Sequence, residues 1–292
     1  MKPSILFRAG SVAACFLYAA MPSESEAQPR GYNYDEAKVP EYRLPDPLVC
    51  LDGSKVTDAE TWRAKRRPEV LRLFEDHVYG RSPGKPEEMR FEVVEEGAEA
   101  LGGKAVRRQV VLHLGKGEKA LAVNLLLYLP KGALKPSPGF LTLNFRGNHT
   151  THADPGIRIT KAWVPNDNGA KDHRATEAGR GARSSRWAIE TIVSRGYAFG
   201  SIYCGDVDPD FHDGYKNGPH ALFPPKDPAK RKPTDWASIA GWAWGLSRGL
   251  DYLETDGDVD ATRVAVMGHS RLGKTSLWAG AADERFALVV SN

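Results

Sequence analysis

Hydrophobic and polar positions in the first half of the chain form three runs that are typical of β-strands. The runs lie at 89–96, 105–114 and 119–129. Period-two alternation in the segment RRQVVLHL of the second run predicts an antiparallel pair at the edge of a mixed sheet. The third run, LAVNLLLYLP, is too apolar for a strand that faces solvent. We therefore expect this third strand to be buried.

A helical pattern precedes these strands. Thr57 and Glu60 form a capping box, in which each side chain bonds a backbone N–H of the first turn. Pro68 predicts the start of a second helix, because proline suits the first helical position. Residues 28–56, rich in Pro, Tyr and Asp, predict an extended arm before a domain at 57–292. The apolar face of the second helix is formed by Val70, Leu71, Phe74 and Val78.

From Gly139 onward, apolar strands alternate with helices. The strand segments are GFLTLNF, YAFGSIYC, RVAVM and FALVV. Helices are expected around WAIETIVSRG, from Asp235 to about Glu254, and at KTSLWAGAA. Parallel neighbours need a crossover connection, which is usually helical. The alternation therefore predicts an α/β fold with a mostly parallel sheet.

The composition limits the class of protein. The 292 residues suit one large α/β domain or two small ones. A hydrophobic content of 41%, a charged content of 26% and a net charge of +3 exclude a disordered chain and a dedicated nucleic-acid binder. Three cysteines exclude a disulfide scaffold. Cys50 and Cys204 are interpreted as buried free thiols, and the alternative is that they pair.

Residues 1–27 have the features of a secretory leader. Two basic residues precede the apolar run 9–21, which is too short to span a bilayer, and small residues mark a cleavage point near Ala27. The alternative is a lipoprotein signal at Cys15, which fits less well because the apolar run continues past the cysteine. We therefore expect an exported protein, secreted or periplasmic, without stable membrane insertion.

The tight turn between RVAVM and the last helix admits two chemistries. The pattern Gly268-x-x-x-x-Gly273-Lys274-Thr275 matches a phosphate-binding loop, in which Lys274 would reach the phosphates and Thr275 would hold magnesium. Such loops normally follow an early strand, and a later strand then supplies the magnesium-binding acid. Here the chain continues only through residues 276–292. A nucleotide binder is therefore the lesser alternative.

The second chemistry is that of a nucleophile elbow. Ser270 would then lie at the apex of a strained strand-to-helix turn, with its hydroxyl raised above the sheet. Gly268, two residues before the serine, has no Cβ that could clash with the tightly turned backbone. The glycine usual two positions after the serine is replaced by Leu272, and Gly273 follows it. A further alternative is that Ser270 merely caps the helix.

Several blocks of the sequence occur in the same order in a known family. GHSRLGK at the turn resembles the G-x-S-R-x-G-K elbow of the glucuronoyl esterases, carbohydrate esterase family fifteen. The resemblance covers the chain from about Pro40 to its end. It implies an α/β-hydrolase fold with helices on both faces of a mostly parallel sheet, lacking its C-terminal strands. The other blocks that carry the resemblance are Asn144–His149, Arg195–Ala198, Gly205–Asp210, Trp242–Arg248 and Leu277–Asn292.

The resemblance assigns roles to three residues. Ser270 matches the family's nucleophile, Arg271 the arginine that helps to stabilise the oxyanion, and Lys274 the lysine that contacts hydroxyls of the glucuronate ring. His269 stands where fungal members carry a disulfide-forming cysteine, so that bond is absent here. The implied activity is hydrolysis of 4-O-methyl-glucuronoyl esters between xylan and lignin. The resemblance implies a monomer without a metal or organic cofactor.

The expected triad is incomplete in this sequence. In α/β-hydrolases the acid and the histidine follow the serine, but no histidine follows Ser270, and the later acids are Asp283 and Glu284. On the order of 100 residues are lacking, at about 30 per strand–helix unit. We therefore expect a truncated chain, inactive as written, whose histidine and acid lie beyond Asn292. One hypothesis makes His149 a substitute base, and the competing interpretation is that it holds its loop.

Other polar clusters are interpreted as structural. His149, His152 and Asp154 lack the spacing of a metal site. In the acidic series after YAFGSIYC, Phe211 occupies the position where a calcium loop needs glycine. The basic run 226–232 is expected to be a solvated loop. Three tryptophans are expected to pack inside or to line the rim of a cleft, with sugar stacking as an alternative role: Trp236, Trp242 and Trp244.

Two alternative functions remain open beside the nucleotide binder. An acetyl-xylan esterase, or another carbohydrate esterase, would use the same nucleophile on a different ester. A non-catalytic sugar-binding remnant would bind xylo-oligosaccharides without depending on Ser270. A glucuronoyl esterase hydrolyses benzyl glucuronate, whereas the first alternative hydrolyses acetylated xylan. Sugar binding that does not change when Ser270 is replaced identifies the second alternative.

Overall fold

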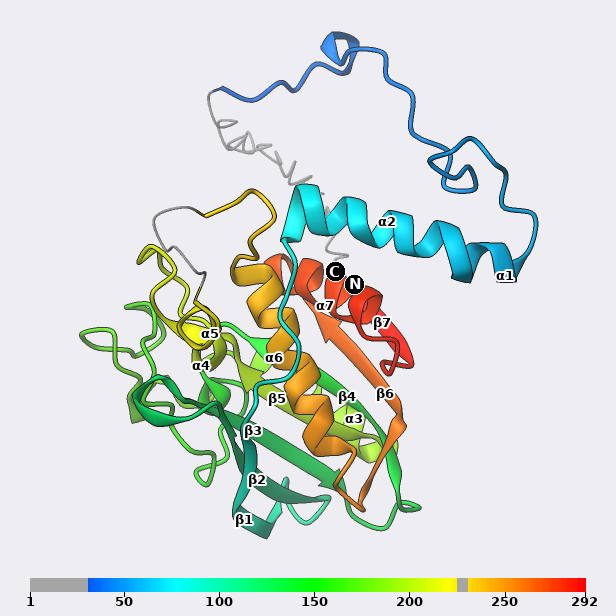
Figure 1. Cartoon of the computed structure of the whole chain (residues 1–292). Helices are drawn as coiled ribbons and strands as arrows, with labels where there is room; N and C mark the ends of the chain where they lie inside the picture. Colours follow the sequence, from blue (N-terminus) through cyan, green and yellow to red (C-terminus); the bar gives the residue numbers. More distant parts are fainter. Residues whose placement is uncertain (1–30, 225–230) are drawn as a thin grey trace, which may run out of the picture. The chain divides into compact units, whose positions relative to one another are not determined.

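The structure is a computed structural model that describes residues 31–224 and 231–292. The leader predicted at 1–27 and most of the basic run predicted at 226–232 lie outside the described residues. Residues 31–46 belong to one compact unit, and Pro47–Asn292 form another. The first unit contains a 3₁₀ turn, Glu36–Lys38, whose first N–H groups are capped by the side chain of Asp35. The second unit holds the sheet (Figure 1).

The described residues form a seven-stranded sheet in the order β1-β2-β3-β5-β4-β6-β7. Neighbouring strands from β1 to β5 pair antiparallel, whereas β5, β4, β6 and β7 are parallel to one another. Because β2 runs in the same direction as these four, the sheet is mostly parallel, and the antiparallel pair expected at its edge is confirmed. The strands are β1 (Met89–Ala100), β2 (Ala105–Leu114), β3 (Leu121–Pro130), β4 (Ser137–Asn144), β5 (Ala198–Tyr203), β6 (Val259–Gly268) and β7 (Leu288–Ser291).

Helices cover both faces of the sheet, as expected. Helix α3 (Ile189–Ser194) packs on β3 and β5, and α6 (Ser238–Leu253) packs on β4 and β6. Successive side chains of a strand point to opposite faces. On β3, accordingly, Leu125 and Leu127 join the core that contains α6, whereas Leu126 joins the smaller core that contains α3.

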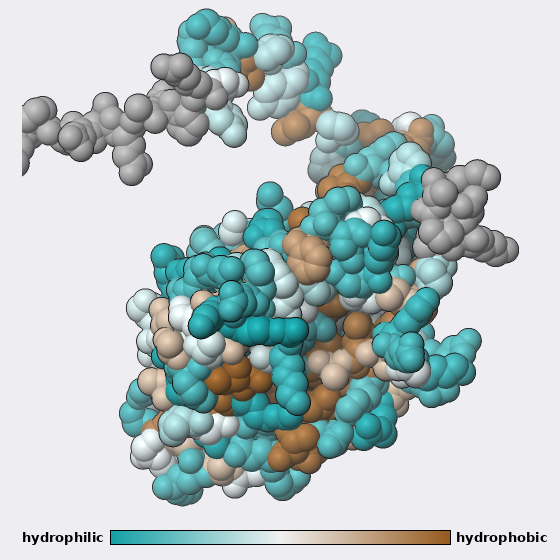
Figure 2. All heavy atoms as spheres, turned by 90° about the vertical axis from the view of Figure 1, so that its left-hand side faces the viewer, coloured by the Kyte–Doolittle hydropathy of each residue, from teal (hydrophilic) through white to brown (hydrophobic). Residues whose placement is uncertain are grey.

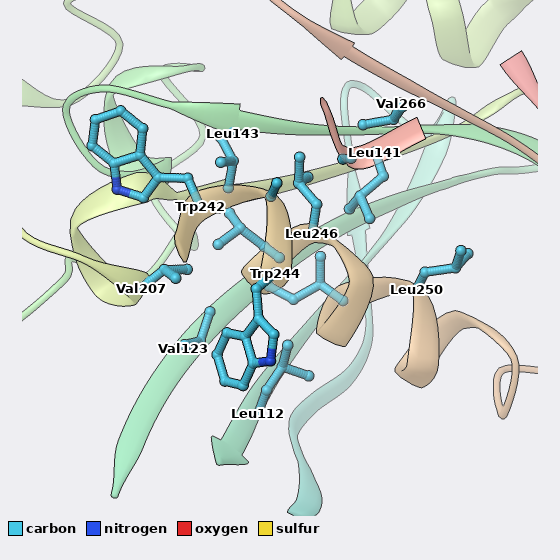
Figure 3. Packing of buried hydrophobic residues seen from close by; sticks show 14 of the residues in the cluster. Leu112, Val123, Leu141, Leu143, Val207, Trp242, Trp244, Leu246, Leu250 and Val266 are labelled. Atoms are coloured by element: carbon cyan, nitrogen blue, oxygen red, sulfur yellow. The ribbon is translucent and has the colours of Figure 1, made fainter. Parts of the chain in front are cut away.

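The larger core is centred on α6, which is almost wholly buried. A helix that is apolar on most sides has to be covered in this way. Gly249 lets α6 approach the sheet, because a Cβ there would lie 2.9 Å from Cδ1 of Ile202. The expected tryptophans are at most 7% exposed, so they pack inside, and Trp242 also lines a cavity. Figure 3 shows this packing of helix against strands, with Trp242, Trp244, Leu246 and Leu250 from α6 and Leu112, Val123, Leu141 and Leu143 from the sheet.

One helical segment precedes the sheet, and it begins differently from the expectation. The capping box is wrong, because Asp58 is the N-cap and its carboxylate accepts the N–H of Thr61 at 2.7 Å. Pro68 lies in the first turn of α2, as expected, but α2 is not a separate helix. Pro68 lies at a change from π to α winding within a continuous helical segment, which consists of α1 (Ala59–Thr61), a π turn (Trp62–Arg66), α2 (Arg67–Phe74) and a second π turn (Glu75–Tyr79).

The apolar face predicted for α2 is only partly covered. Leu71 packs on the core, whereas Phe74 and Val78 are exposed. The neighbour of α2 is α7 (Arg271–Ala282), which connects β6 to β7. Arg67 donates to the carbonyl of Ala281 at 2.8 Å, so α2 is fastened to the C-terminal end of α7.

The two cysteines within the described residues are free. Cys50 and Cys204 are 3% and 0% exposed and unpaired, which confirms their interpretation as buried thiols. Burial raises the pKa of the Cys204 thiol well above its usual range. This thiol is therefore not a nucleophile at neutral pH.

One face of the molecule is mainly polar. Figure 2 shows one face on which hydrophilic residues predominate and hydrophobic residues come to the surface in patches. Among the described residues, no helix combines the length and the apolar character that a membrane span requires.

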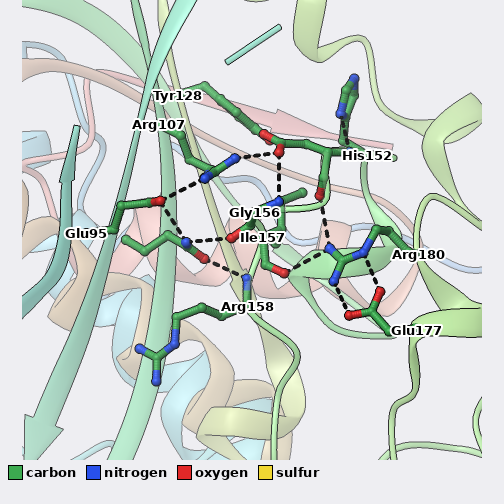
Figure 4. A network of polar contacts seen from close by, with 11 residues as sticks. Glu95, Arg107, Tyr128, His152, Gly156, Ile157, Arg158, Glu177 and Arg180 are labelled. Carbon is green, nitrogen blue, oxygen red and sulfur yellow. Dashed lines mark hydrogen bonds and ion pairs between the residues drawn. The ribbon is translucent and has the colours of Figure 1, made fainter. Parts of the chain in front are cut away.

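The long loop between β4 and α3 is anchored to β2 by Arg107 (Figure 4). The Arg107 guanidinium donates to both carboxylate oxygens of Glu95 at 2.7 Å, and it also binds the carboxylate of Asp154 in the loop. Asp154 accepts two further hydrogen bonds, from the Tyr128 hydroxyl at 2.8 Å and from the Gly156 N–H at 3.0 Å. The start of the loop is thus held by a buried charge network.

A second arginine holds the same loop further along. Arg180 donates to the backbone carbonyls of Asp154 and Ile157, both at 2.9 Å, and forms an ion pair with Glu177 (Figure 4). The His152 ring accepts the N–H of Asp154 at 3.0 Å. The polar residues of this loop therefore bind the loop itself and fix its path across the end of the sheet.

Candidate active site

Ser270 lies at the sharp turn between β6 and α7. Its backbone has φ 57° and ψ −122°, a conformation that is costly for a residue with a side chain. Gly268 has to be glycine here, because a Cβ would lie 2.1 Å from the carbonyl oxygen of Leu272. Ser270 is exposed, and its side chain makes no capping hydrogen bond to α7. The turn has the geometry of a nucleophile elbow, and the alternative of a simple helix cap is wrong.

Leu272 takes the position that is usually glycine, and the close backbone approach after the serine occurs at Gly273. Leu272 points into the core and is 2% exposed. A Cβ on Gly273 would lie 2.6 Å from the carbonyl oxygen of Asn292. Asn292 also accepts the N–H of Ser270 at 2.6 Å and donates to the Gly268 carbonyl at 3.1 Å. The turn that carries Ser270 is therefore hydrogen-bonded to the residue that follows β7.

The alternative of a phosphate-binding loop does not agree with this turn. Thr275, which would hold magnesium, is 0% exposed and donates its hydroxyl to the Arg271 carbonyl at 2.9 Å. A buried hydroxyl that is already bonded within the helix is not available to a metal ion. Lys274 is exposed and lies one helical turn along from Arg271, on the side of α7 that faces solvent.

The side chain of Arg271 is held in place by Asp210. Nη1 donates to Oδ1 at 2.6 Å and Nη2 to Oδ2 at 2.8 Å, a paired arrangement that fixes the plane of the guanidinium. Its Cζ also lies 5.3 Å from the ring centre of Phe145 and 5.8 Å from that of Trp242. A positive charge is thereby fixed immediately after Ser270, where an oxyanion hole needs it.

A cavity of about 380 Å³ opens beside Arg271. Its walls come from the segment after β5, from α5 (Gly218–Leu222) and from the start of α6. The short helix α4 (Cys204–Val207) leads into this segment from the end of β5. Carboxylates, histidines and aromatic rings share the lining, which consists of Asp208, Asp210, Phe211, His212, Asp213, Tyr215, Asn217, His220, Ser238, Ile239, Trp242 and Arg271.

The structure reveals two participants that sequence reasoning misses. The sequence interprets Asp210 as part of a loop turn, yet it is the partner of Arg271 from 61 residues earlier in the chain. His220 has no role in the sequence interpretation, yet it lines the cavity next to that pair. The position of the acidic series directly after a parallel strand is the signal that could have found them, because ligands bind at the carboxyl ends of such strands.

His149 occupies a buried position in the loop after β4. It is 1% exposed and does not line the cavity beside Arg271. Its backbone carbonyl accepts the N–H of Gly181, and its Nδ1 has no hydrogen-bond partner within the described residues. Burial, assisted by the charge of Arg180, lowers the pKa of His149 to about 4. These contacts favour the role of holding the loop over that of a substitute base.

The lowered pKa of His149 predicts acid destabilisation. The unfolded chain takes up the histidine proton near pH 6.5, the ordinary pKa of the imidazole, whereas the folded chain resists it down to about 4. Stability is therefore present above pH 6.5 and is lost as the pH falls toward 4. Between pH 7.5 and 5.0 this group alone removes ~2 kcal/mol from the free energy of unfolding.

Urea unfolding at the two pH values measures this loss. In the His149→Gln variant the difference between the two pH values is expected to shrink by about that amount. The matched control is His77→Gln, at an exposed position on the second π turn of the N-terminal helical segment. An unchanged pH difference in His149→Gln would contradict the prediction.

Comparisons with known proteins agree with this geometry. The family model "Glucuronyl esterase, fungi" matches residues 231–292. Carbohydrate esterase MZ0003, from an unknown prokaryotic organism, is 52% identical over 268 residues, which cover 91% of this chain and 62% of that protein. The solved glucuronoyl esterase from Solibacter usitatus is 45% identical, with a TM-score of 0.81 over 88% of this chain and 65% of that one. The 4-O-methyl-glucuronoyl methylesterase of Schizophyllum commune is 25% identical and matches 85% of this chain and 48% of its own length.

The sheet, the helices on both of its faces and the serine elbow define an α/β-hydrolase fold, which confirms the expected fold class. The chain belongs to the glucuronoyl esterase family, carbohydrate esterase family fifteen. It spans between 48% and 65% of the length of the three relatives just described.

Proposed function

We propose that the protein is a serine carboxylesterase that cleaves 4-O-methyl-glucuronoyl esters between xylan and lignin. The observation that carries this proposal is the exposed Ser270 on a strained elbow, followed at once by an arginine that Asp210 holds in place. The relatives named glucuronoyl esterase and 4-O-methyl-glucuronoyl methylesterase support the class of ester.

In the proposed reaction Ser270 Oγ attacks the ester carbonyl and forms an acyl-enzyme. The Arg271 guanidinium and backbone N–H stabilise the oxyanion, and the Lys274 ammonium binds hydroxyls of the glucuronate ring. The alcohol leaves, and water then releases the free glucuronate. A general base has to take the Ser270 proton. No histidine follows Ser270 within these 292 residues, so the protein isolated from its own cells is the one to assay.

We further propose that the protein acts outside the cytoplasm, as a monomer, on plant cell-wall material. The leader predicted at 1–27 supports export. The intact mass of the protein isolated from its own cells tests the leader. A product that retains residues 1–27 would contradict cleavage near Ala27.

The experiment that tests the activity compares two esters. The full-length protein is given benzyl glucuronate and acetylated xylan in parallel, and release of glucuronate and of acetate is measured. We expect hydrolysis of benzyl glucuronate, with little release of acetate. Release of acetate alone would replace the proposal with an acetyl-xylan esterase. Binding of xylo-oligosaccharides without hydrolysis of either ester would identify a non-catalytic sugar-binding protein.

A further inference from the structure

The cavity beside Arg271 contains two buried polar side chains that suggest a ligand. His220 is 3% exposed, and neither of its ring nitrogens has a hydrogen-bond partner within the part of the chain that the structure describes. Asp208 is also 3% exposed, and its Oδ2 lies 3.9 Å from Nε2 of His220. This distance is too long for a direct hydrogen bond. The Asp208 carboxylate already accepts a hydrogen bond from Ser238 and can accept more, whereas the His220 nitrogens have no partner among the described residues. Because an unpaired buried nitrogen is costly, His220 calls for a third group between the two side chains.

The protonation states indicate what kind of group fits. Burial lowers the pKa of His220 to about 4 and raises that of Asp208 to about 6. At neutral pH the imidazole is therefore uncharged, with one N–H donor and one acceptor nitrogen, and the carboxylate accepts hydrogen bonds. A hydroxyl can accept from the first and donate to the second, which neither a carboxylate nor an ammonium ion can do.

The charge of the lining favours a neutral occupant over an anionic one. Asp210 already neutralises Arg271. Asp208 and Asp213 add two further carboxylates to the lining, while the nearby Arg231 guanidinium offsets part of this negative charge. A uronate carboxylate would be repelled from such a space, whereas the hydroxyls of a neutral ring would find acceptors in it.

Aromatic rings supply the remaining walls. Phe211, Tyr215 and Trp242 line the cavity. Tyr215 is fixed on one side by the Arg231 guanidinium, 3.6 Å from its ring centre, and it meets His220 edge-on at 5.1 Å. Flat apolar surfaces beside hydrogen-bonding groups suit a pyranose ring, which has apolar faces and a polar edge. The volume of about 380 Å³ falls in the range of small-molecule sites.

We propose that this cavity is a subsite for a neutral pyranose unit of the carbohydrate, in which His220 and Asp208 hold one ring hydroxyl between them. A hydroxyl oxygen at ordinary hydrogen-bond length from each partner spans the 3.9 Å gap. The inference rests on the proposed function, because it places this unit beside the uronate ester that Ser270 attacks. It adds a recognition site for the uncharged part of the polysaccharide.

The test measures binding of xylotriose, a neutral sugar without an ester, to the full-length protein. Calorimetry gives the affinity, and ¹⁵N NMR of the histidine rings reports on His220 directly. We expect xylotriose to shift the His220 ring nitrogens in the unaltered protein. In His220→Leu and in Asp208→Asn we expect at least tenfold weaker binding, whereas the matched control His77→Leu, at an exposed position, binds as the unaltered protein does.

Each outcome of this test is decisive. No shift of the His220 resonances with xylotriose means that water alone fills the gap, which overturns the subsite. A shift with 3-phenylpropan-1-ol but not with xylotriose also overturns it, in favour of a site for an aromatic alcohol. The NMR titration of the unaltered protein decides the matter even if His220→Leu fails to fold. Because xylotriose carries no ester, its binding is measured independently of the activity. Binding of xylotriose by a protein that does not hydrolyse benzyl glucuronate would remove the proposed activity and leave the subsite standing.

Discussion

Replacing Ser270 by alanine is expected to lower kcat/KM for benzyl glucuronate by a factor of about ten thousand or more in the full-length protein. The reason is geometric. The elbow raises one hydroxyl above the end of the sheet, and the charge of Arg271 is fixed beside it by Asp210. Without that oxygen there is no acyl-enzyme, although the oxyanion donors and the binding groups remain.

The stability of the Ser270→Ala variant is expected to stay close to that of the unaltered protein. The Ser270 side chain makes no capping hydrogen bond, and alanine meets the same backbone strain at φ 57°. The matched control is Ser194→Ala, at an exposed serine of α3 whose hydroxyl donates to the Thr191 carbonyl. Steady-state kinetics and thermal unfolding of the three proteins separate the two effects. Full activity in Ser270→Ala would remove the serine from the mechanism.

Replacing Arg107 by methionine is expected to cost about 3–5 kcal/mol of unfolding free energy. Methionine fills much of the space of the arginine stem but leaves two carboxylates without their cation. The side chains of Glu95 and Asp154 are 26% and 10% exposed, so water compensates them only in part. Arg107 and its two carboxylate partners differ from an ordinary surface ion pair because they are largely buried.

Urea unfolding measures the cost, and the matched control is Arg90→Met. Arg90 also lies at the β1–β2 edge of the sheet, but its pair with Glu92 is exposed and 3.4 Å long, so the change there is expected to stay within about 0.5 kcal/mol. Amide hydrogen exchange supplies a second reading, because loss of Arg107 is expected to speed exchange in the loop around Gly156. Equal destabilisation by the two substitutions would contradict the special weight given to the buried network.

The strands and the elbow could be predicted because their signals are local. The run 105–114 matches β2 residue for residue, and the central strands differ from their expected bounds by a few residues at each end. The strand, the glycine and the serine in sequence predict the elbow. The helical start could not be predicted, because Thr57 and Asp58 both suit a cap, and the choice depends on which side chain reaches the N–H of Thr61.

The choice between an elbow and a phosphate loop could not be made from the pattern alone. Both are glycine-rich turns between a strand and a helix, and the sequence here satisfies both patterns. The burial of Thr275 decides between them, and burial depends on what packs against the helix. The same limit explains why sequence reasoning misses Asp210 and His220. Their roles depend on contacts between segments that are far apart in the sequence. The periodicity of hydrophobic residues along the chain does not predict such contacts.

The ion pair between Arg271 and Asp210 has a consequence for how this protein can change. Asp210 belongs to the same stretch of chain that lines the cavity, so one loop both shapes the proposed carbohydrate subsite and orients the arginine. Selection for a new polysaccharide decoration would act on that loop and would move the guanidinium with it. Specificity and turnover are thus inherited together. Directed evolution that broadens the substrate specificity is expected to pass through variants with a lower kcat, unless Asp210 and the residues next to it are kept unchanged.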